Sequence, residues 1–170
     1  MRAAGVELVR LDGDSPRVAD LRAAVLKLRL APGQHRFSAE AVNTLPRADA
    51  DPNRTPFAVL CSDVPVGFGI VDRLGVLGEI ADDPARAVLL RAFYIDPQWQ
   101  GQGVGRAACA ALDSLVRGIA PEATEVLLTV NEGNPAAVRA YLAGGFAHTG
   151  RRYLGGDAGP QYVLRRPVGE

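Results

Sequence analysis

A strand followed by a run of glycines is the feature of this sequence with the clearest chemical meaning. Residues 87–95 form a nearly continuous apolar run, which is typical of a strand buried on both faces, and residues 100–105 read Gln-Gly-Gln-Gly-Val-Gly. A helical repeat of apolar side chains begins directly afterwards, near Gly103. Glycines allow a ligand to approach the backbone closely, and the unpaired N–H groups of a helix N-terminus attract anions. The segment therefore predicts a phosphate-binding turn.

A second motif lies one strand further along the chain. Residues 134–146 read Asn-Pro-Ala-Ala-Val-Arg-Ala-Tyr-Leu-Ala-Gly-Gly-Phe and fit the pattern N-x-x-A-x-x-x-Y-x-x-x-G-F, while residues 100–105 fit Q/R-x-x-G-x-G. With a strand between them, the two motifs resemble those of the GNAT superfamily of acyl-CoA-dependent N-acetyltransferases. The resemblance covers residues 87–149.

The resemblance implies that acetyl-CoA binds as the acyl donor and that no metal takes part. It assigns the coenzyme pyrophosphate to backbone N–H groups of Gly101, Gln102, Gly103, Val104, Gly105 and Arg106. The backbone edge of Phe93, Tyr94 and Ile95 would pair with the pantetheine arm like an added strand, and one N–H of that edge would polarise the thioester carbonyl. Asn134 would contact the pantetheine region.

Tyr141 is the residue that the resemblance places beside the thioester sulfur. It follows Asn134 by seven residues, or two helical turns, and would protonate the leaving thiolate. An ordinary phenol has a pKa near 10 and keeps its proton at neutral pH, so it can serve as a general acid. The alternative is a core residue of an amphipathic helix. Gly144, Gly145 and Phe146 are expected to form a helix C-cap and a packed strand residue.

The group that takes the proton from the amine stays open. An alkylammonium ion with a pKa near 10.4 is almost entirely protonated at pH 7, so a proton must leave before or during attack. Some GNAT proteins carry a glutamate on the strand before the asparagine-containing helix, whereas this chain has Thr129 at that position. Glu79, Glu132, Tyr94 and a chain of water molecules are the alternatives.

The first half of the chain carries a further likeness, which concerns the acceptor. Residues 34–37, 56–59 and 65–68, together with 93–96, resemble the diamine and spermine/spermidine acetyltransferase branch, although strand packing would explain them as well. The likeness implies a small-molecule primary amine such as a polyamine. A polycation needs clustered carboxylates to replace its hydration, and two long loops offer a set of them: Asp49, Asp51, Glu79, Asp82 and Asp83.

The order of the expected elements is that of a mixed α/β fold. Sequence patterns predict strands at 6–11, 56–61, 66–71, 87–95, 126–130, 146–149 and 161–165, and helices at 16–30, 38–45, 103–118 and 134–143. An early hairpin and a late βαβα order predict an α/β (α+β) GNAT-like fold with a central mixed sheet of about six to seven strands flanked by helices. The length predicts a single domain over residues 1–170.

Composition and charge disfavour several classes of function. Nineteen basic residues balance nineteen acidic ones, so we expect neither nucleic acid nor a membrane surface as a partner. No apolar run approaches the ~18 residues of a membrane helix, and no export signal is evident. Two cysteines without CxxC spacing predict a reduced, cytoplasmic protein, and His35 and His148 are too isolated for a metal site. A homodimer is left open.

Three alternatives to small-amine acetylation stay open. The acceptor could be a protein N-terminus or an amino acid. The domain could bind acyl-CoA and regulate a partner without transferring the acyl group. A dinucleotide-binding domain is disfavoured, because the acidic residue expected about 20 positions after the glycines is missing from a strand end, since Glu122 and Glu125 follow Pro121.

Overall fold

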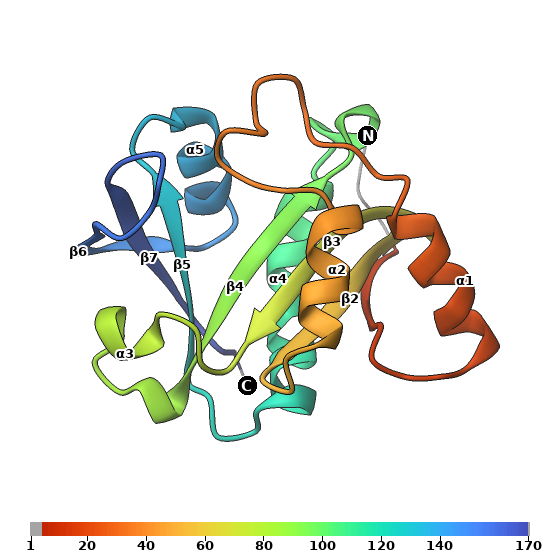
Figure 1. The fold of residues 1–170 in the computed structure, drawn as a ribbon, viewed down its shortest axis with the longest axis horizontal. Helices are drawn as coiled ribbons and strands as arrows, with labels where there is room; N and C mark the ends of the chain where they lie inside the picture. Colours follow the sequence, from red (N-terminus) through yellow and green to blue (C-terminus); the bar gives the residue numbers. More distant parts are fainter. Residues whose placement is uncertain (1–4, 170) are drawn as a thin grey trace.

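The structure is a computed structural model that describes residues 5–169 and is built around one seven-stranded sheet (Figure 1). Its strands are β1 (Val6–Arg10), β2 (Arg54–Cys61), β3 (Val64–Asp72), β4 (Ala87–Ile95), β5 (Glu125–Asn131), β6 (Ala147–Tyr153) and β7 (Gln161–Pro167). They lie in the order β1-β2-β3-β4-β5-β7-β6, and every neighbouring pair is antiparallel except β4 and β5. The mixed sheet expected from the sequence is confirmed.

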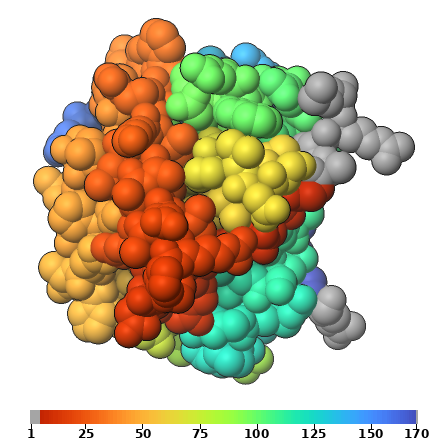
Figure 2. All heavy atoms as spheres, turned by 90° about the vertical axis from the view of Figure 1, so that its right-hand side faces the viewer, coloured from red at the N-terminus to blue at the C-terminus, as the bar shows by residue number. Residues whose placement is uncertain are grey.

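Helices cover both faces of this sheet. Helices α1 (Pro16–Val25) and α2 (Ala41–Asp49) pack on one face, where their buried leucines meet Phe68 and Tyr94, and α4 (Val104–Ile119) packs on the other. Helix α5 (Pro135–Ala143) contacts α4 and β5. Figure 2 shows α1 and the chain after it, in red and orange, crossing one side of the molecule beside the yellow β2–β3 turn.

The sheet splits between β4 and β5, and this split positions the candidate site. The two strands pair only over Ala87–Leu89 and Glu125–Leu127. Beyond Leu89, β4 continues to Ile95 with β3 on one side only, while the rest of β5 stays paired with β7. Within residues 5–169, the second half of β4 therefore presents toward β5 a backbone edge that no strand pairs with, as a strand-like ligand would require.

A β-bulge in β4 changes which side chains face α4. The residue pairs on its two sides are Ile70 with Arg91 and Phe68 with Tyr94, so that Ala92 and Phe93 face a single residue of β3. Ala92 has a φ of 53°, a left-handed conformation that is uncommon for a non-glycine residue and found mostly at constrained sites. After the bulge, Phe93 and Ile95 contact the α4 core, whereas Tyr94 points to the face covered by α1 and α2.

The first helix is shorter than the predicted 16–30, because it ends at Val25. The N–H of Leu28 bonds the Val25 carbonyl (3.1 Å), an i to i+3 bond that tightens the chain out of the α-helix. Tertiary bonds then replace helical ones: the Leu28 carbonyl accepts from the Tyr94 hydroxyl (3.1 Å), and the Leu30 N–H donates to Glu40 (2.9 Å). Leu28 and Leu30 are still buried, so the apolar pattern continues past the end of α1 and led to the prediction of a longer helix.

The second helix differs from its prediction as well. It begins after Glu40 instead of at Ser38 and runs through Pro46 to Asp49. Proline removes one N–H donor, and the Val42 carbonyl that loses its partner belongs to a half-exposed residue that water can reach.

The loop expected over 74–85 contains a short helix, α3 (Leu77–Ile80), and a 3₁₀ turn (Pro84–Arg86). The edge strand β6 extends to Tyr153 instead of ending at 149.

Candidate active site

The N-terminus of α4 has the groups of an anion site and lacks the usual protein caps. Gly101 and Gly103 adopt left-handed φ values of 76° and 84°, and the first helical bond runs from the Ala107 N–H to the Gly103 carbonyl (3.1 Å). Within residues 5–169, the amides of residues 101–106 have no hydrogen-bond acceptor, and the first turn contains no acidic side chain. Arg106 is exposed there although the helix dipole disfavours a cation. An anion would satisfy these amides and the arginine together.

Gly105 shows that this turn keeps free space. The residue lies in the first turn of α4 with a helical conformation, so its backbone does not require glycine. A Cβ atom added to it would meet no other atom within 4 Å. Packing in the described structure therefore does not explain the glycine, whereas close approach of a phosphate to the helix backbone would.

Phe93, Tyr94 and Ile95 supply the unpaired edge of β4, as expected. The Gln100 side chain donates to the Ile95 carbonyl (2.9 Å), which ties the glycine turn to the end of the strand. The Tyr94 side chain lies on the opposite face, where its hydroxyl donates to the Leu28 carbonyl and accepts from the Ala41 N–H (2.8 Å). Burial raises the pKa of Tyr94, and its proton is engaged, so this phenol does not fit the role of a general base.

Tyr141 on α5 faces β4 across the split in the sheet. Its ring centroid lies 6.3 Å from that of Phe93, so the structure brings the predicted acid beside the predicted pantetheine edge. Within the described residues, no hydrogen-bond partner contacts the Tyr141 hydroxyl. Burial raises the pKa of Tyr141, with a smaller contribution from nearby Cys109, whose own pKa burial raises to about 11. The phenol therefore stays protonated at neutral pH, as a general acid must be before it transfers its proton.

The end of α5 explains the spacing of the second motif. The Phe146 N–H bonds the Tyr141 carbonyl (3.1 Å) and the Gly145 N–H bonds the Leu142 carbonyl (3.2 Å), which together form a Schellman C-cap. Gly145 supplies the left-handed φ of 95° that this cap needs. The Phe146 ring packs edge-on against Tyr141, with centroids 5.7 Å apart. The expected helix C-cap is confirmed, and it fixes the backbone of Tyr141.

Asn134 lies at the start of α5 but contacts a residue that the sequence did not single out. Its side-chain amide donates to the Gln34 oxygen (2.9 Å) and accepts from the Gln34 nitrogen (3.3 Å). Asn134 is only 6% exposed. The segment between α1 and α2 thus reaches across the open end of β4 to α5, as the orange loop in Figure 1 shows. The likeness at residues 34–37 pointed to this segment, but only the fold reveals the amide pair.

The candidate bases other than Tyr94 are not placed for direct proton transfer. Glu79 is exposed on α3, which packs near the beginning of β4 and against β6. The Glu132 carboxylate is paired with Arg152 (2.8 Å). Thr129, which stands where some GNAT proteins have a glutamate, is half-buried on β5. A chain of water molecules stays open as the route for the proton.

The carboxylates expected to bind a polyamine do not form one cluster. Asp82 pairs with Arg151, Asp49 with Arg22, and Asp51 with Arg54 (3.4 Å). Asp82 and Asp83 also precede Ala87, the first residue of β4. Phe93 lies six residues after Ala87 on that strand, which is about 20 Å from Ala87. The geometry therefore does not support the expectation that the loop at 74–85 supplies charges at the reacting atoms.

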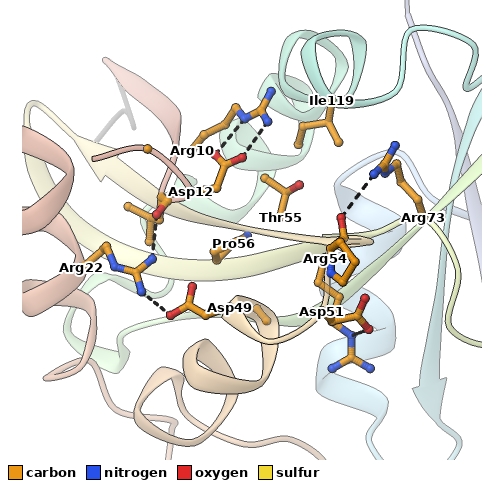
Figure 3. A pocket seen from close by; sticks show the side chains of 14 residues that line it. Arg10, Asp12, Arg22, Asp49, Asp51, Arg54, Thr55, Pro56, Arg73 and Ile119 are labelled. Atoms are coloured by element: carbon orange, nitrogen blue, oxygen red, sulfur yellow. Dashed lines mark hydrogen bonds and ion pairs between the residues drawn. The ribbon is translucent and has the colours of Figure 1, made fainter. Parts of the chain in front are cut away.

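A pocket of about 500 Å³ lies away from these groups (Figure 3). It includes Ile119, the last residue of α4, and a helix of 16 residues is about 24 Å long, so the pocket is far from the glycine turn. Its charged side chains mostly neutralise one another: Arg10 pairs with Asp12 (2.8 Å), Arg22 with Asp49, and Arg54 with Asp51. These internal ion pairs leave it little capacity for a charged substrate.

The described residues contain no group of three or more His, Cys, Asp or Glu side chains arranged to hold a metal ion. No helix among residues 5–169 is long and apolar enough to cross a bilayer. His35 contacts Glu40 (3.3 Å) and His148 packs against Tyr162.

Comparison with known proteins gives a consistent result for the whole site region. Residues 22–146 match the acetyltransferase (GNAT) family. The uncharacterized N-acetyltransferase YbbJ of Bacillus subtilis is 32% identical over 130 residues, which cover 76% of this chain and 80% of YbbJ. The N-alpha-acetyltransferase RimI of Mycobacterium tuberculosis is 28% identical over 151 residues, covering 88% and 87%.

Solved structures share the fold at lower sequence identity. The aminoglycoside acetyltransferase AAC(6')-Ib, solved with paromomycin and acetyl-CoA, matches with a TM-score of 0.71 and 19% identity over 95% of this chain and 93% of that one. Spermidine N-acetyltransferase of Vibrio cholerae, solved with CoA and spermine, matches with a TM-score of 0.61 and 14% identity over 96% and 95%.

Proposed function

The chain belongs to the GNAT family and is an acetyl-CoA-dependent N-acetyltransferase, and from this premise we propose that it acetylates a primary amine of a small molecule by direct attack on the thioester, with Tyr141 as the general acid. The observation that carries the proposal is the position of Tyr141, whose ring lies 6.3 Å from Phe93 at the unpaired edge of β4.

The coenzyme would lie along two features: the amides of residues 101–106, which have no hydrogen-bond acceptor within residues 5–169, and the edge of β4 beyond Leu89, which pairs with no strand on the β5 side there. Its pyrophosphate would accept from the backbone of Gly101, Gln102, Gly103, Val104, Gly105 and Arg106 at the α4 N-terminus. Its pantetheine arm would pair with β4 at Phe93, Tyr94 and Ile95 and reach Asn134 at the start of α5. This placement brings the thioester between the β4 bulge and Tyr141.

The chemical step needs few protein groups. The amine nitrogen attacks the thioester carbon, the C–N bond forms, and negative charge develops on the carbonyl oxygen, which an N–H of the β4 edge would stabilise. When the C–S bond breaks, its electron pair stays on sulfur and the Tyr141 proton neutralises the thiolate. The amine loses its proton through water, and the phenol regains one from solvent.

A polyamine is the acceptor that the first-half likeness favours. The spermidine acetyltransferase that was solved with spermine shares the fold of this chain, which agrees with that likeness. The shared fold adds no information about the acceptor of this chain. Because Asp49, Asp51 and Asp82 are paired with arginines here, a polyamine would have to displace an arginine from its carboxylate to gain an ion pair. We therefore propose a polyamine as one member of a small-amine class and do not restrict the class to it.

A peptide N-terminus is the second candidate acceptor. The relative RimI, named as an N-alpha-acetyltransferase, aligns with 88% of this chain. An α-amino group has a lower pKa than an alkylamine, about 7.7 to 8.0, so a larger fraction is neutral at pH 7. Such an acceptor depends less on a carboxylate base, and neither Glu79 nor Glu132 is placed for that role.

A thiol-release assay with acetyl-CoA tests the proposal. The panel contains spermine, a monoamine, an aminoglycoside and a peptide with a free N-terminus. We expect turnover with at least one small amine. Turnover with the peptide alone would favour the second candidate. Calorimetric binding of acetyl-CoA without thiol release for any acceptor would contradict catalysis and favour a regulatory acyl-CoA-binding module.

A further inference from the structure

An arginine outside the two motifs contacts the C-cap that holds Tyr141. Arg166 lies on β7, and its Nε donates to the Gly144 carbonyl (3.1 Å), next to the Schellman turn. One of its terminal nitrogens donates to a carboxylate oxygen of Asp113 on α4 (2.6 Å). A single guanidinium thus joins β7, α4 and the end of α5.

This contact is shielded from solvent. The side chains of Arg166 and Asp113 are 16% and 22% exposed, which distinguishes them from surface ion pairs such as that of Arg165 with Glu125, where the arginine is 47% exposed. An ion pair with little solvent access is screened weakly, and removing one partner leaves the other charge unpaired. The guanidinium is suited to this place because it directs donors along two lines at once.

The C-cap of α5 packs tightly against α4 and against Arg166. A Cβ atom on Gly144 would lie 2.6 Å from the Cys109 sulfur, and one on Gly145 would lie 3.1 Å from Arg166 Nε. The helix end is therefore in direct contact with α4 on one side and with the guanidinium on the other. Tyr141 is three residues before Gly144, and its carbonyl accepts bonds from the cap, so a shift of the cap moves Tyr141 as well.

We propose that Arg166, held by Asp113, is a positioning residue that sets the distance between the Tyr141 hydroxyl and the thioester bound along β4. The proposal rests on the proposed role of Tyr141 as general acid. Arg166 need not touch the coenzyme for this role. It acts through the α5 C-cap, and a misplacement on the order of 1 Å is enough to reduce a rate about 100-fold.

The test compares Arg166→Met with Arg165→Met, a matched control on the same strand. For Arg166→Met we expect kcat to fall between about 10-fold and 100-fold, with acetyl-CoA affinity by calorimetry within about 2-fold. Arg165→Met should keep wild-type kcat. Arg166→Lys, which keeps the charge but not the two-directional donors, should recover part of the loss. If Arg166→Met does not fold, Asp113→Asn, which keeps the shape of the carboxylate, is the substitute. Its kcat should also fall, by a smaller factor than is expected for Arg166→Met.

A double variant separates this inference from the proposed function. If Arg166 acts only through Tyr141, then adding Arg166→Met to Tyr141→Phe should reduce kcat by no more than about 2-fold further. Losses that multiply, or an unchanged kcat in Arg166→Met, would overturn the positioning role while leaving Tyr141 as the acid. Wild-type kcat in Tyr141→Phe alone would instead overturn the proposed function, and the positioning role with it.

Discussion

Gln34 and Asn134 are 100 positions apart and share a reciprocal amide pair, with N···O distances of 2.9 and 3.3 Å. The pair joins the segment before α2 to the first residue of the α5 motif. Each amide keeps one further N–H and one further lone pair, so Asn134 can still contact a ligand while Gln34 fixes its orientation.

Replacing Gln34 with leucine tests this relationship. Because the Asn134 amide loses its orienting partner, we expect the KM for acetyl-CoA to rise about 3-fold to 10-fold with little change in kcat, since one lost hydrogen bond is worth roughly 1 kcal/mol. Steady-state kinetics at a saturating acceptor concentration measure both. A lower KM would mean that Gln34 competes with the coenzyme for Asn134 and would contradict the orienting role.

Gly105→Asp tests the phosphate turn more cleanly than a change at Gly103. Gly103 has a left-handed φ of 84°, so any side chain there adds backbone strain, whereas Gly105 is helical and has open space around it. A carboxylate in the first turn of a helix is stabilised by the dipole, so the fold should survive. It should repel the pyrophosphate and weaken acetyl-CoA binding by at least about 100-fold, since two lost charge-assisted hydrogen bonds are worth roughly 3 kcal/mol.

Gly105→Asn is the control for that variant, because it has the same shape without the charge. Calorimetry should show a much smaller loss of acetyl-CoA affinity for asparagine than for aspartate. Equal losses would assign the effect to bulk, and unchanged affinity in a folded Gly105→Asp protein would remove the α4 N-terminus from the coenzyme site.

The position of Asp82 and Asp83 before β4 predicts that their charges do not affect amine binding. Changing Asp82 and Asp83 together to asparagine should alter the KM for spermine and for a monoamine by the same factor, near one, because both residues precede β4, whose first residue is about 20 Å from Phe93, and Asp82 is paired with Arg151. A selective rise in the spermine KM would show that the polyamine reaches this loop after all.

Cys109 gives a prediction for alkaline stability. Burial raises the pKa of its thiol to about 11, above the value of about 8.5 to 9 expected in the unfolded chain, so the contribution is fully present below pH 9 and is lost as the pH rises toward 11. At one pKa unit per 1.36 kcal/mol, the loss approaches about 3 kcal/mol. Urea unfolding at pH 7 and pH 10.5 should therefore show a smaller decrease for Cys109→Ala than for the wild type. An equal decrease in both proteins would contradict a buried, protonated thiol.

The sequence allowed a good prediction of the parts that depend on local pattern. The glycine turn before α4 and the cap after Tyr141 depend on backbone conformations that glycine favours, and both lie where the motifs indicated. The predicted end of α1 was wrong, because Leu28 and Leu30 pack into the same core as α1 from an irregular segment, whose backbone is held by bonds to Tyr94 and Glu40, and not from a helix. No local pattern distinguishes these two causes of burial.

Features that depend on pairing between distant segments could not be predicted. The bulge at Ala92 arises from the register of β4 against β3, and alanine is not a residue that marks a left-handed position. The contacts of Gln34 with Asn134 and of Arg166 with Gly144 join residues far apart in the chain. With nineteen basic residues, all but one of them arginine, the composition did not single out Arg166.

The turnover of Tyr141→Phe at saturating acetyl-CoA and acceptor measures directly whether the Tyr141 hydroxyl is the general acid. The change removes only the hydroxyl and keeps the ring contacts with Phe93 and Phe146, so acetyl-CoA affinity should stay within about 2-fold. If Tyr141 is the general acid, kcat, followed as release of the CoA thiol, falls about 10² to 10⁴-fold, the usual contribution of general acid catalysis. Wild-type kcat in this variant would contradict the assignment of Tyr141 as the acid.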